Sequence, residues 1–411
     1  MPATGPATNH AAADRCPGVL RLAEAADGYL ARIRLPGGLI GAGAMRALAR
    51  LASELGDGRM ELTSRGNVQL RGLAADAAGP LTDQLSQAGQ LPSLSHDRVR
   101  NVLASPLAGL DGGPDLTAIV QALDTALCAR PRLAELPGRF LFAVDDGRGD
   151  VAGLGADVLA RVRADGAVVN GLAVRGAATG HPVAGHAGHA VVEDVVTVML
   201  ACAEAFLDAR AAQGGTAWRI ADLADGPARV RAAVAARLGL AAAAQPMAGS
   251  PAPAVSDGTG GTGALAAPTA RPVGVVGPGG TAVVLLAPLG RLTAAQLAWL
   301  VDRVRGRPAR ITPWRSVVLP DLPDAAGVLA DAARLGFGVD AGSPWLRVTA
   351  CAGRPGCASA LADVQADAAG FAARWPERIV HVSGCARHCG RPAATQVDVT
   401  ATSEGYQVAG I

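Results

Sequence analysis

The sequence predicts an α/β fold of the α+β type, with mixed sheets and a duplicated unit related by a pseudo-two-fold axis. Its 411 residues suffice for two or three domains, and 50% of them are hydrophobic. The 53 glycines and 27 prolines stay below the roughly 25–30% that marks low-complexity chains. Global disorder is therefore excluded, and an internal repeat becomes the main guide to the architecture.

The repeat consists of a strand, a turn with proline and glycine, an amphipathic helix and two further strands. One copy spans residues 29–70 and the other spans 281–319. Pro36 aligns with Pro288 and Thr63 with Thr312, so the second copy is three residues shorter after its helix. The alternative is a chance similarity between two Ala-rich α/β segments. A duplication explains the shared order of elements better.

The elements outside the repeat follow from periodicity. Helical spacing covers 194–211 and 227–241, a helix is expected at 358–375 directly after Cys357, and 378–382 predicts a short strand. Residues 241–272 hold only Asp257 and Arg271 as charges, no aromatic residue and no period. That composition predicts a flexible linker.

The charge balance excludes several partners. The 37 basic residues, all arginine, oppose 35 acidic ones, and a net charge of +2 gives no general field for nucleic acid or an acidic membrane. The first twenty residues lack the pattern of a secretory signal, and no apolar stretch reaches eighteen residues. We therefore expect a cytoplasmic protein with neither nucleic acid nor membrane as a partner. Any carboxylate-binding site here must use guanidinium groups.

Four of the seven cysteines form two close pairs, Cys351 with Cys357 and Cys385 with Cys389. Two short loops that each give a thiolate pair suit a [4Fe–4S] cluster. The helix expected after Cys357 would direct its positive end at this anionic group. Structural zinc, a pair of disulfides and unrelated thiols are the alternatives; the five-residue spacer fits zinc poorly, and disulfides require an oxidising compartment.

A polar row follows the first copy's helix. Strand alternation would place Arg65, Asn67, Gln69 and Arg71 on one face of a sheet. Two guanidiniums with two amides suit a ligand rich in carboxylates, whereas the alternative is an ordinary solvated face. The corresponding row of the second copy carries no charge, which favours a specialised first copy. Arg100 and Arg139 lie in two further basic segments that are weak signals alone.

These residues together resemble the sulfite/nitrite reductase superfamily. The resemblance rests on the two repeats, the cysteine set, and segments 63–69, 100–102 and 136–140. It implies ferredoxin-like half-domains at 1–75 and 273–322, a tetrapyrrole-binding domain at 76–240, a linker at 241–272, and an iron–sulfur domain at 323–411. It also implies that Arg65, Arg100 and Arg139 bind tetrapyrrole carboxylates. In the reductases, a sirohaem is bridged to the cluster through the cysteine that corresponds to Cys389.

One departure from the reductases bears on the reaction. They place two lysines, one residue apart, over the bound anion, and here those positions are Arg139 and Leu141. Leucine donates no proton and arginine is a poor acid. Reduction of sulfite or nitrite is therefore not expected as the main activity.

The precorrin-3B synthase branch of the superfamily fits better. Segments 16–18, 27–28, 34–38 and 381–385 are similar to it. The resemblance implies an oxidoreductase of the monooxygenase type in aerobic cobalamin biosynthesis. Such an enzyme hydroxylates precorrin-3A at C20 with O₂ and closes a γ-lactone, with NADH as the electron source through an electron-donor protein or reductase.

A cluster that transfers single electrons is not expected to activate O₂ alone, so the resemblance also implies a mononuclear non-haem iron. Candidate ligands are His181, His186 and His189, with Asp145 and Asp146; a polar loop is the alternative for the histidines. Two other functions stay open, a sirohaem-dependent sulfite or nitrite reductase and a non-catalytic electron carrier.

Overall fold

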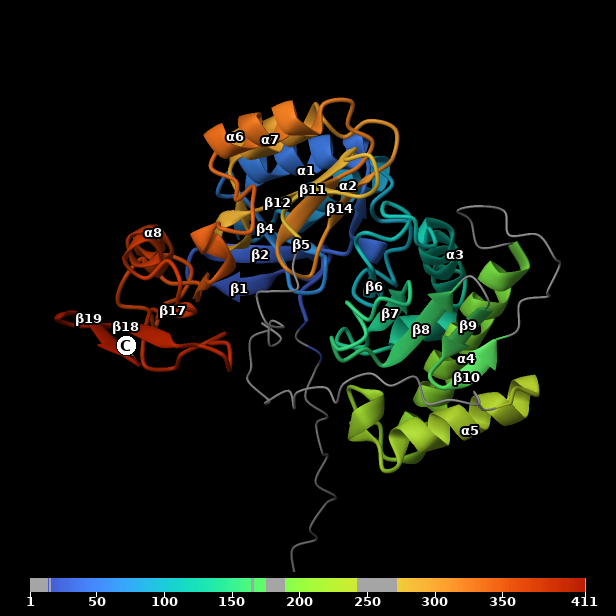
Figure 1. Ribbon diagram of the computed structural model, residues 1–411. Helices are drawn as coiled ribbons and strands as arrows, with labels where there is room; N and C mark the ends of the chain where they lie inside the picture. The colour runs from blue at the N-terminus through green and yellow to red at the C-terminus, as the bar shows by residue number, and fades with distance from the viewer. Residues whose placement is uncertain (1–13, 15, 164–165, 175–188, 242–271, 411) are drawn as a thin grey trace, which may run out of the picture.

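A computed structural model describes residue 14 and residues 16–163, 166–174, 189–241 and 272–410. Two central sheets lie beneath a layer of helices, with one α/β lobe on either side of them (Figure 1). The predicted fold class, a duplicated α/β architecture with mixed sheets, is confirmed. Residues 242–271 of the predicted linker lie outside the described residues.

Each copy of the repeat supplies strands and two helices to the centre. The elements of the first copy are β1 (Ala23–Ala25), β2 (Gly28–Ile33), β3 (Leu39–Ile40), α1 (Ala42–Leu55), β4 (Met60–Leu62), β5 (Val68–Leu73) and α2 (Ala78–Gln87). Those of the second copy are β11 (Gly274–Val276), β12 (Ala282–Leu286), β13 (Arg291–Leu292), α6 (Ala294–Val301), β14 (Ala309–Ile311), β15 (Ser316–Leu319) and α7 (Ala325–Arg334). The order of elements is the same in both.

The two copies exchange one short strand. The first sheet has the order β1-β2-β5-β4-β13, and the second has β11-β12-β15-β14-β3. Each sheet thus ends on a strand from the other copy, as a pseudo-two-fold axis requires. The registers agree as well, because Arg32 pairs with Gln69 in the first sheet and Val284 with Val318 in the second.

One hydrophobic core joins the copies. It combines residues of both sheets and their helices, including Met45 and Leu48 of α1 and Leu297 and Leu300 of α6. Each of these side chains is fully buried, and burial of one such side chain contributes about 1.5–3 kcal/mol. The spacing of these residues at three and four positions explains why both segments form helices with one face on the sheets.

The first lobe is built on a five-stranded sheet of order β10-β9-β8-β7-β6. Its elements are β6 (Val102–Ala104), α3 (Thr117–Cys128), β7 (Phe142–Asp145), β8 (Val158–Arg163), β9 (Gly166–Val169), β10 (Leu172–Val174), α4 (His189–Ala212) and α5 (Gly226–Leu238). Helices α4 and α5 correspond to the two helices expected between 194 and 241. They pack with α3 around a separate core.

The C-terminal lobe carries the cysteine pairs. It contains β16 (Val348–Ala350), α8 (Val364–Arg374), β17 (Val380–Ser383), β18 (Val397–Thr402) and β19 (Gly405–Ala409). The prediction of a helix directly after Cys357 is wrong. The helix begins at Val364, where the Asp363 side chain accepts a hydrogen bond from the Ala366 N–H. Leu361 instead donates its N–H to the Gly384 carbonyl, so no helix N-terminus follows Cys357.

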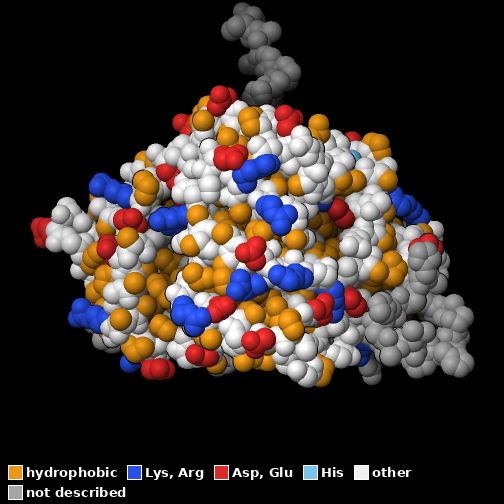
Figure 2. All heavy atoms as spheres, turned by 90° about the horizontal axis from the view of Figure 1, so that it is seen from above, with side chains coloured by type: hydrophobic (Ala, Val, Ile, Leu, Met, Phe, Trp, Pro, Cys, Tyr) orange, Lys and Arg blue, Asp and Glu red, His pale blue; other side chains and the backbone are white. Residues whose placement is uncertain are grey.

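The surface agrees with the nearly balanced charge. On the face shown in Figure 2, basic and acidic side chains are interspersed rather than gathered by sign. Within the described ranges, no helix has the length and apolar character needed to cross a membrane.

Candidate functional site

Three arginines of the first copy form what we call the arginine cluster, Arg32, Arg34 and Arg65. Arg32 and Arg34 alternate with Ala31 and Ile33, which point into the core. Their side chains therefore lie on the opposite face of the first sheet. Arg65 lies in the turn between β4 and β5, and its charge acts on both other arginines.

Arg34 is the most buried of the three, at 2% exposed. Its Nε donates to the Arg98 carbonyl at 3.3 Å and its Nη2 to the Pro17 carbonyl at 3.4 Å, while Nη1 has no partner. Burial, and then repulsion by Arg32, lower the pKa of Arg34 to about 9. The protein therefore holds this cation at an energetic cost.

The other two arginines are also short of partners. Arg32 donates from Nη2 to Gln69 at 3.1 Å, and its buried Nε has no acceptor. Arg65 donates to the Arg139 carbonyl at 3.2 Å. Burial, followed by repulsion from Arg219, lowers the pKa of Arg65 to about 10.

None of the three arginines forms an ion pair with a carboxylate of the described chain. Buried charges are costly unless they are paired. A ligand with several carboxylates would provide the missing counterions, and guanidinium groups bind carboxylates with two parallel hydrogen bonds. The arginine cluster is therefore suited to a polyanionic ligand.

Several residues of the predicted polar row bond within the protein instead. Asn67 accepts from the Leu35 N–H at 2.9 Å and donates to Asn101 at 3.3 Å. Gln69 donates to Glu61 at 2.5 Å. Both amides thus have internal partners, and Asn67 is only 1% exposed.

Arg71 and Arg100 are each held by an aspartate. Arg71 forms two hydrogen bonds of 2.9 Å with Asp27, and Arg100 forms two of 2.7 Å with Asp124. Arg100 also donates to the Gln90 carbonyl at 2.8 Å. The structure brings neither arginine into the set that lacks counterions.

Arg139 and Leu141 differ sharply in exposure. Arg139 is exposed and its guanidinium lies 5.7 Å from the centre of the Trp218 ring. Leu141 is 2% exposed and packs with Leu103 and Ala143. The position that carries a lysine in the reductases is thus part of a small apolar core.

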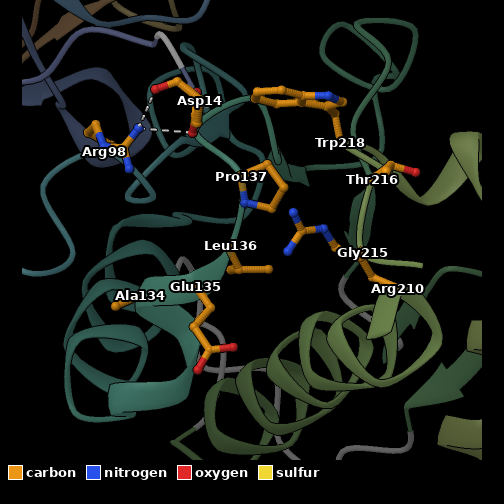
Figure 3. Close-up of a pocket in the computed structure, with 10 residues that line it drawn as sticks. All are labelled: Asp14, Arg98, Ala134, Glu135, Leu136, Pro137, Arg210, Gly215, Thr216 and Trp218. Carbon is orange, nitrogen blue, oxygen red and sulfur yellow. Dashed lines mark hydrogen bonds and ion pairs between the residues drawn. The ribbon is translucent and has the colours of Figure 1, made fainter. Parts of the chain in front are cut away.

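A cavity of about 310 Å³ lies beside this region (Figure 3). Its wall includes Trp218, Pro137 and Arg210, and an ion pair between Arg98 and Asp14 lies at its edge. Small-molecule pockets span about 300–1,000 Å³. The cavity therefore lies at the small end of the range for small-molecule pockets.

The sequence analysis placed Cys16 and Arg34 in segments similar to precorrin-3B synthase without giving either a role in the site, and it did not name Arg32. Cys16 lies against Gly138, where an added Cβ would approach the Cys16 Cβ within 2.7 Å. Burial, then the charge of Asp14, raise the pKa of the Cys16 thiol. The alternation of arginine with apolar residues along β2 and directly after it was a visible signal for Arg32 and Arg34, whereas Cys16 was noted only within the segment 16–18 that is similar to precorrin-3B synthase.

The cysteine pairs lie after adjacent parallel strands, since Cys351 follows β16 and Cys385 follows β17. The Gly384 N–H donates to the Cys351 sulfur at 3.1 Å. Burial raises the pKa of the Cys351 thiol, and the charges of Cys389 and Cys357 add to this rise. The fold thus brings the Cys357 and Cys389 thiols within electrostatic reach of Cys351.

Two buried polar atoms near the thiols fit a cluster. The Nε2 of His381 and the Oγ of Ser383 are buried without a hydrogen-bond partner, and both residues precede Cys385 on β17. In the described part of the chain, no three His, Cys, Asp or Glu side chains converge as ligands of a single metal ion. A cubane spaces its thiolates more widely, because each binds a different iron. Sulfur atoms of a cluster could accept hydrogen bonds from both orphaned groups.

The structure describes the side chains of only two of the predicted iron ligands, Asp145 and Asp146. His181 and His186 fall outside the described residues, and His189 begins α4, with its side chain likewise outside them. Asp145 is fully buried, with one oxygen accepting from the Gly147 N–H, and Asp146 forms an ion pair with Arg148. Asp145 and Asp146 therefore have partners within the protein, and an iron site that includes the three histidines stays a prediction.

The fold and the first sheet define the class of this protein. Residues 22–88 match the nitrite/sulfite reductase ferredoxin-like half domain. The whole fold is similar to that of the Mycobacterium tuberculosis NirA protein, with a TM-score of 0.65, 21% identity and coverage of 92% of this chain and 73% of that one. The chain therefore has the duplicated nitrite/sulfite reductase architecture.

The chain is also similar over nearly its full length to a precorrin-3B synthase from Sinorhizobium sp., which is 29% identical over 99% of this chain and 85% of that protein. A ferredoxin–nitrite reductase from Synechococcus elongatus is 34% identical, but over only 29% of this chain and 25% of that protein. A ferredoxin sulfite reductase from Mycobacterium tuberculosis is 30% identical over 30% of this chain and 23% of that protein. The resemblance to the superfamily and to its precorrin-3B synthase branch is confirmed.

Proposed function

We propose that the chain is a precorrin-3B synthase of aerobic cobalamin biosynthesis, which hydroxylates precorrin-3A at C20 and closes a γ-lactone. One oxygen atom of O₂ enters the product, and the other leaves as water with two electrons and two protons. The similarity over the full chain to a precorrin-3B synthase supports the assignment. The observation that carries it is the arginine cluster, in which the buried Arg34 and the half-buried Arg32 and Arg65 form no ion pair with a carboxylate of the described chain.

The arginine cluster would bind and orient the substrate. Precorrin-3A and sirohaem derive from the same octacarboxylate macrocycle, so one basic surface suits either. Arg34 and Arg65 would each donate hydrogen bonds to a carboxylate of the substrate, and Arg32 would donate one from its unpartnered Nε. Their fixed positions on β2, directly after it and in the β4–β5 turn would set how C20 is presented. Arg139, stacked on Trp218 at the surface, would contact the outer edge of the macrocycle.

The four cysteines Cys351, Cys357, Cys385 and Cys389 would hold a [4Fe–4S] cluster. When bound, the cluster would supply single electrons from NADH, delivered by a donor protein or reductase. The chain's own groups would donate hydrogen bonds to it: the Gly384 N–H, which reaches the Cys351 sulfur, and the buried His381 and Ser383. The mononuclear non-haem iron stays a proposal, with His181, His186 and His189 as candidate ligands.

A sirohaem-dependent sulfite or nitrite reductase is the second candidate, favoured by the half-domain match. Two features weigh against it. The buried Leu141 has no proton to donate, and arginine, the residue at position 139, is a poor general acid. A visible spectrum of the purified protein separates the two candidates, since sirohaem absorbs as a chlorin and a cluster alone gives a broad brown shoulder.

Labelled oxygen tests the reaction directly. Anaerobically purified, reconstituted protein is incubated with precorrin-3A, a reductant and ¹⁸O₂, and the product is weighed by mass spectrometry. We expect one labelled oxygen atom per product molecule. Unlabelled precorrin, together with sulfide or ammonia formed from sulfite or nitrite, would replace the proposal with the second candidate.

A binding measurement tests the arginine cluster. Arg65→Ala should weaken the binding of uroporphyrin, an octacarboxylate probe, by about tenfold or more, because one charge-assisted contact contributes about 1.5–3 kcal/mol. The control is Arg46→Ala, which removes an exposed arginine from α1. Fluorescence titration measures both. Equal affinities in the two variants would remove Arg65 from the site.

A further inference from the structure

We propose that Arg71 is a positioning residue that holds the Cys351–Cys357 segment on the first sheet and so fixes the cluster relative to the substrate site. This differs from the substrate-binding role that the sequence indicated for Arg71. It rests on the proposed cluster, and it concerns residues of this chain that the described contacts place together.

The geometry is a three-way contact. Arg71 lies on β5 and is 9% exposed. Its Nε and Nη2 donate to the two oxygens of Asp27 at 2.9 Å each, and Nη2 also donates to the Gly356 carbonyl at 3.0 Å. Gly356 directly precedes Cys357. One guanidinium therefore ties a backbone atom next to a cysteine to the sheet that carries the arginine cluster.

Gly356 allows this close approach because it has no side chain. A Cβ built there would lie 2.8 Å from the Arg71 Nη2 and 3.4 Å from an Asp27 oxygen. Burial lowers the pKa of Arg71, but the hydrogen bonds and charge of Asp27 outweigh burial and leave the pKa raised. The guanidinium thus keeps its charge and its donors.

A second contact from the same sheet reaches the other cysteine of the pair. Gln365 donates to the Cys351 carbonyl at 3.0 Å, and Arg291 of β13 donates to the Gln365 side-chain oxygen. Because β13 belongs to the first sheet, both copies of the repeat hold the first cysteine pair. The second pair is tied within its own lobe, where Arg391 and His388 both contact Asp398.

Strand β5 connects this contact to the arginine cluster. Gln69, which accepts from Arg32, lies two residues before Arg71 on the same strand. Alternate residues share a face and lie about 7 Å apart along a strand. The strand thus links the arginines of the proposed substrate site to the anchor of the cysteine loop.

An ordinary stabilising ion pair is the competing interpretation, and the chain offers a matched control for it. Arg100 and Asp124 form a pair with the same two-bond geometry, and Arg100 is 4% exposed. The described contacts of Arg100 include no cysteine loop. Loss of either pair should affect folding, whereas only loss of Arg71 should affect the cluster.

The experiment compares Arg71→Met, Arg71→Lys and Arg100→Met with the wild-type full chain after anaerobic reconstitution. The readouts are iron and sulfide per chain, the EPR spectrum of the reduced cluster, and the rate of cluster loss to a chelator below the unfolding temperature. We expect Arg71→Met to lose its cluster about tenfold faster, as removal of one charge-assisted hydrogen bond implies. Its EPR spectrum should shift, and Arg71→Lys should restore part of both effects.

The outcomes separate the two proposals. If the wild-type chain takes up no cluster, the cluster assignment itself fails. If the wild type is loaded but Arg71→Met matches Arg100→Met in EPR spectrum and rate of loss, Arg71 is only a stabilising residue and the inference is overturned. The inference is likewise overturned if Arg71→Met loses its cluster at the wild-type rate and has the wild-type EPR spectrum.

Discussion

The two copies of the repeat share a backbone but differ in the sheet face that they leave free of helices. Their β-turns are nearly identical: the Thr63 N–H donates to the Asn67 carbonyl at 2.8 Å, and the Thr312 N–H donates to the Ser316 carbonyl at 2.9 Å. The turn residues that follow, Gly66 and Arg315, have φ angles of 63° and 62°. The two copies therefore have the same backbone conformation even within this single turn.

The side chains on the free face are not retained. Arg32, Arg34 and Gln69 of the first sheet correspond in register to Val284, Leu286 and Val318 of the second. The first set carries unpaired cations, and the second set is apolar and buried. Residues that face the helices specify the fold in both copies, so the opposite face can differ between them: it carries the arginines of the proposed ligand site in one copy and apolar packing residues in the other.

The largest effect is expected when the charge of the first copy is placed in the second. Leu286 is 6% exposed and its backbone bonds to Gly338 in both directions. Leu286→Arg would bury a cation without a partner, which should lower the free energy of unfolding by about 3–5 kcal/mol. Urea denaturation measures this loss. Leu286→Met is the control and should cost less than about 1.5 kcal/mol.

The outcome decides whether the two faces differ in environment or only in sequence. A Leu286→Arg variant as stable as Leu286→Met would mean that the second face also tolerates cations. The contrast between the copies would then carry no information about a ligand.

The reverse exchange should have the opposite sign. Arg34→Leu removes a buried cation that has only two carbonyl contacts, so the ligand-free protein should gain about 1–3 kcal/mol of stability. The same change should weaken uroporphyrin binding by about tenfold or more, because a carboxylate partner is lost. Thermal unfolding without ligand and a fluorescence titration measure the two effects. A variant that loses stability and keeps its affinity would assign Arg34 to structure alone.

The duplicated fold could be predicted because its signals are local. Pro36 and Pro288 mark matching turns, and helical spacing marks α1 and α6 in each copy. The exchange of β3 and β13 could not be predicted, since two-residue strands pair with partners from the other copy, far along the chain. The predicted start of the helix after Cys357 was wrong, because Asp363 caps the N-terminus and the helix begins at Val364.

The site was predictable to the same extent. Cysteine spacing indicated two thiol pairs, and the structure places them after adjacent strands. The partners of the polar row were not predictable, because Asp27 is 44 residues from Arg71, Asn101 is 34 from Asn67, and Asp124 is 24 from Arg100. Strand alternation predicts on which face of the sheet a side chain lies, but it does not predict which carboxylate pairs with it. Those pairings determine which arginines lack a counterion within the protein and could bind the proposed ligand.

The smallest expected effect lies at the matched turns. Arg315 adopts a left-handed conformation that costs an ordinary residue about 1–2 kcal/mol, and its buried Nε has no partner. Arg315→Gly should remove that strain but lose side-chain packing and make the unfolded chain more flexible, so the free energy of unfolding should change by less than about 1 kcal/mol.

Gly66→Ala, at the matching position of the first copy, should instead lower the free energy of unfolding by about 1–2 kcal/mol, because its Cβ would lie 3.1 Å from the Ile311 carbonyl oxygen. Urea denaturation compares the two. Strain relief and lost packing together cannot lower the stability of Arg315→Gly by more than about 2 kcal/mol. A larger loss would mean that the Arg315 guanidinium itself stabilises the second copy. The free face of that copy would then also depend on a cation.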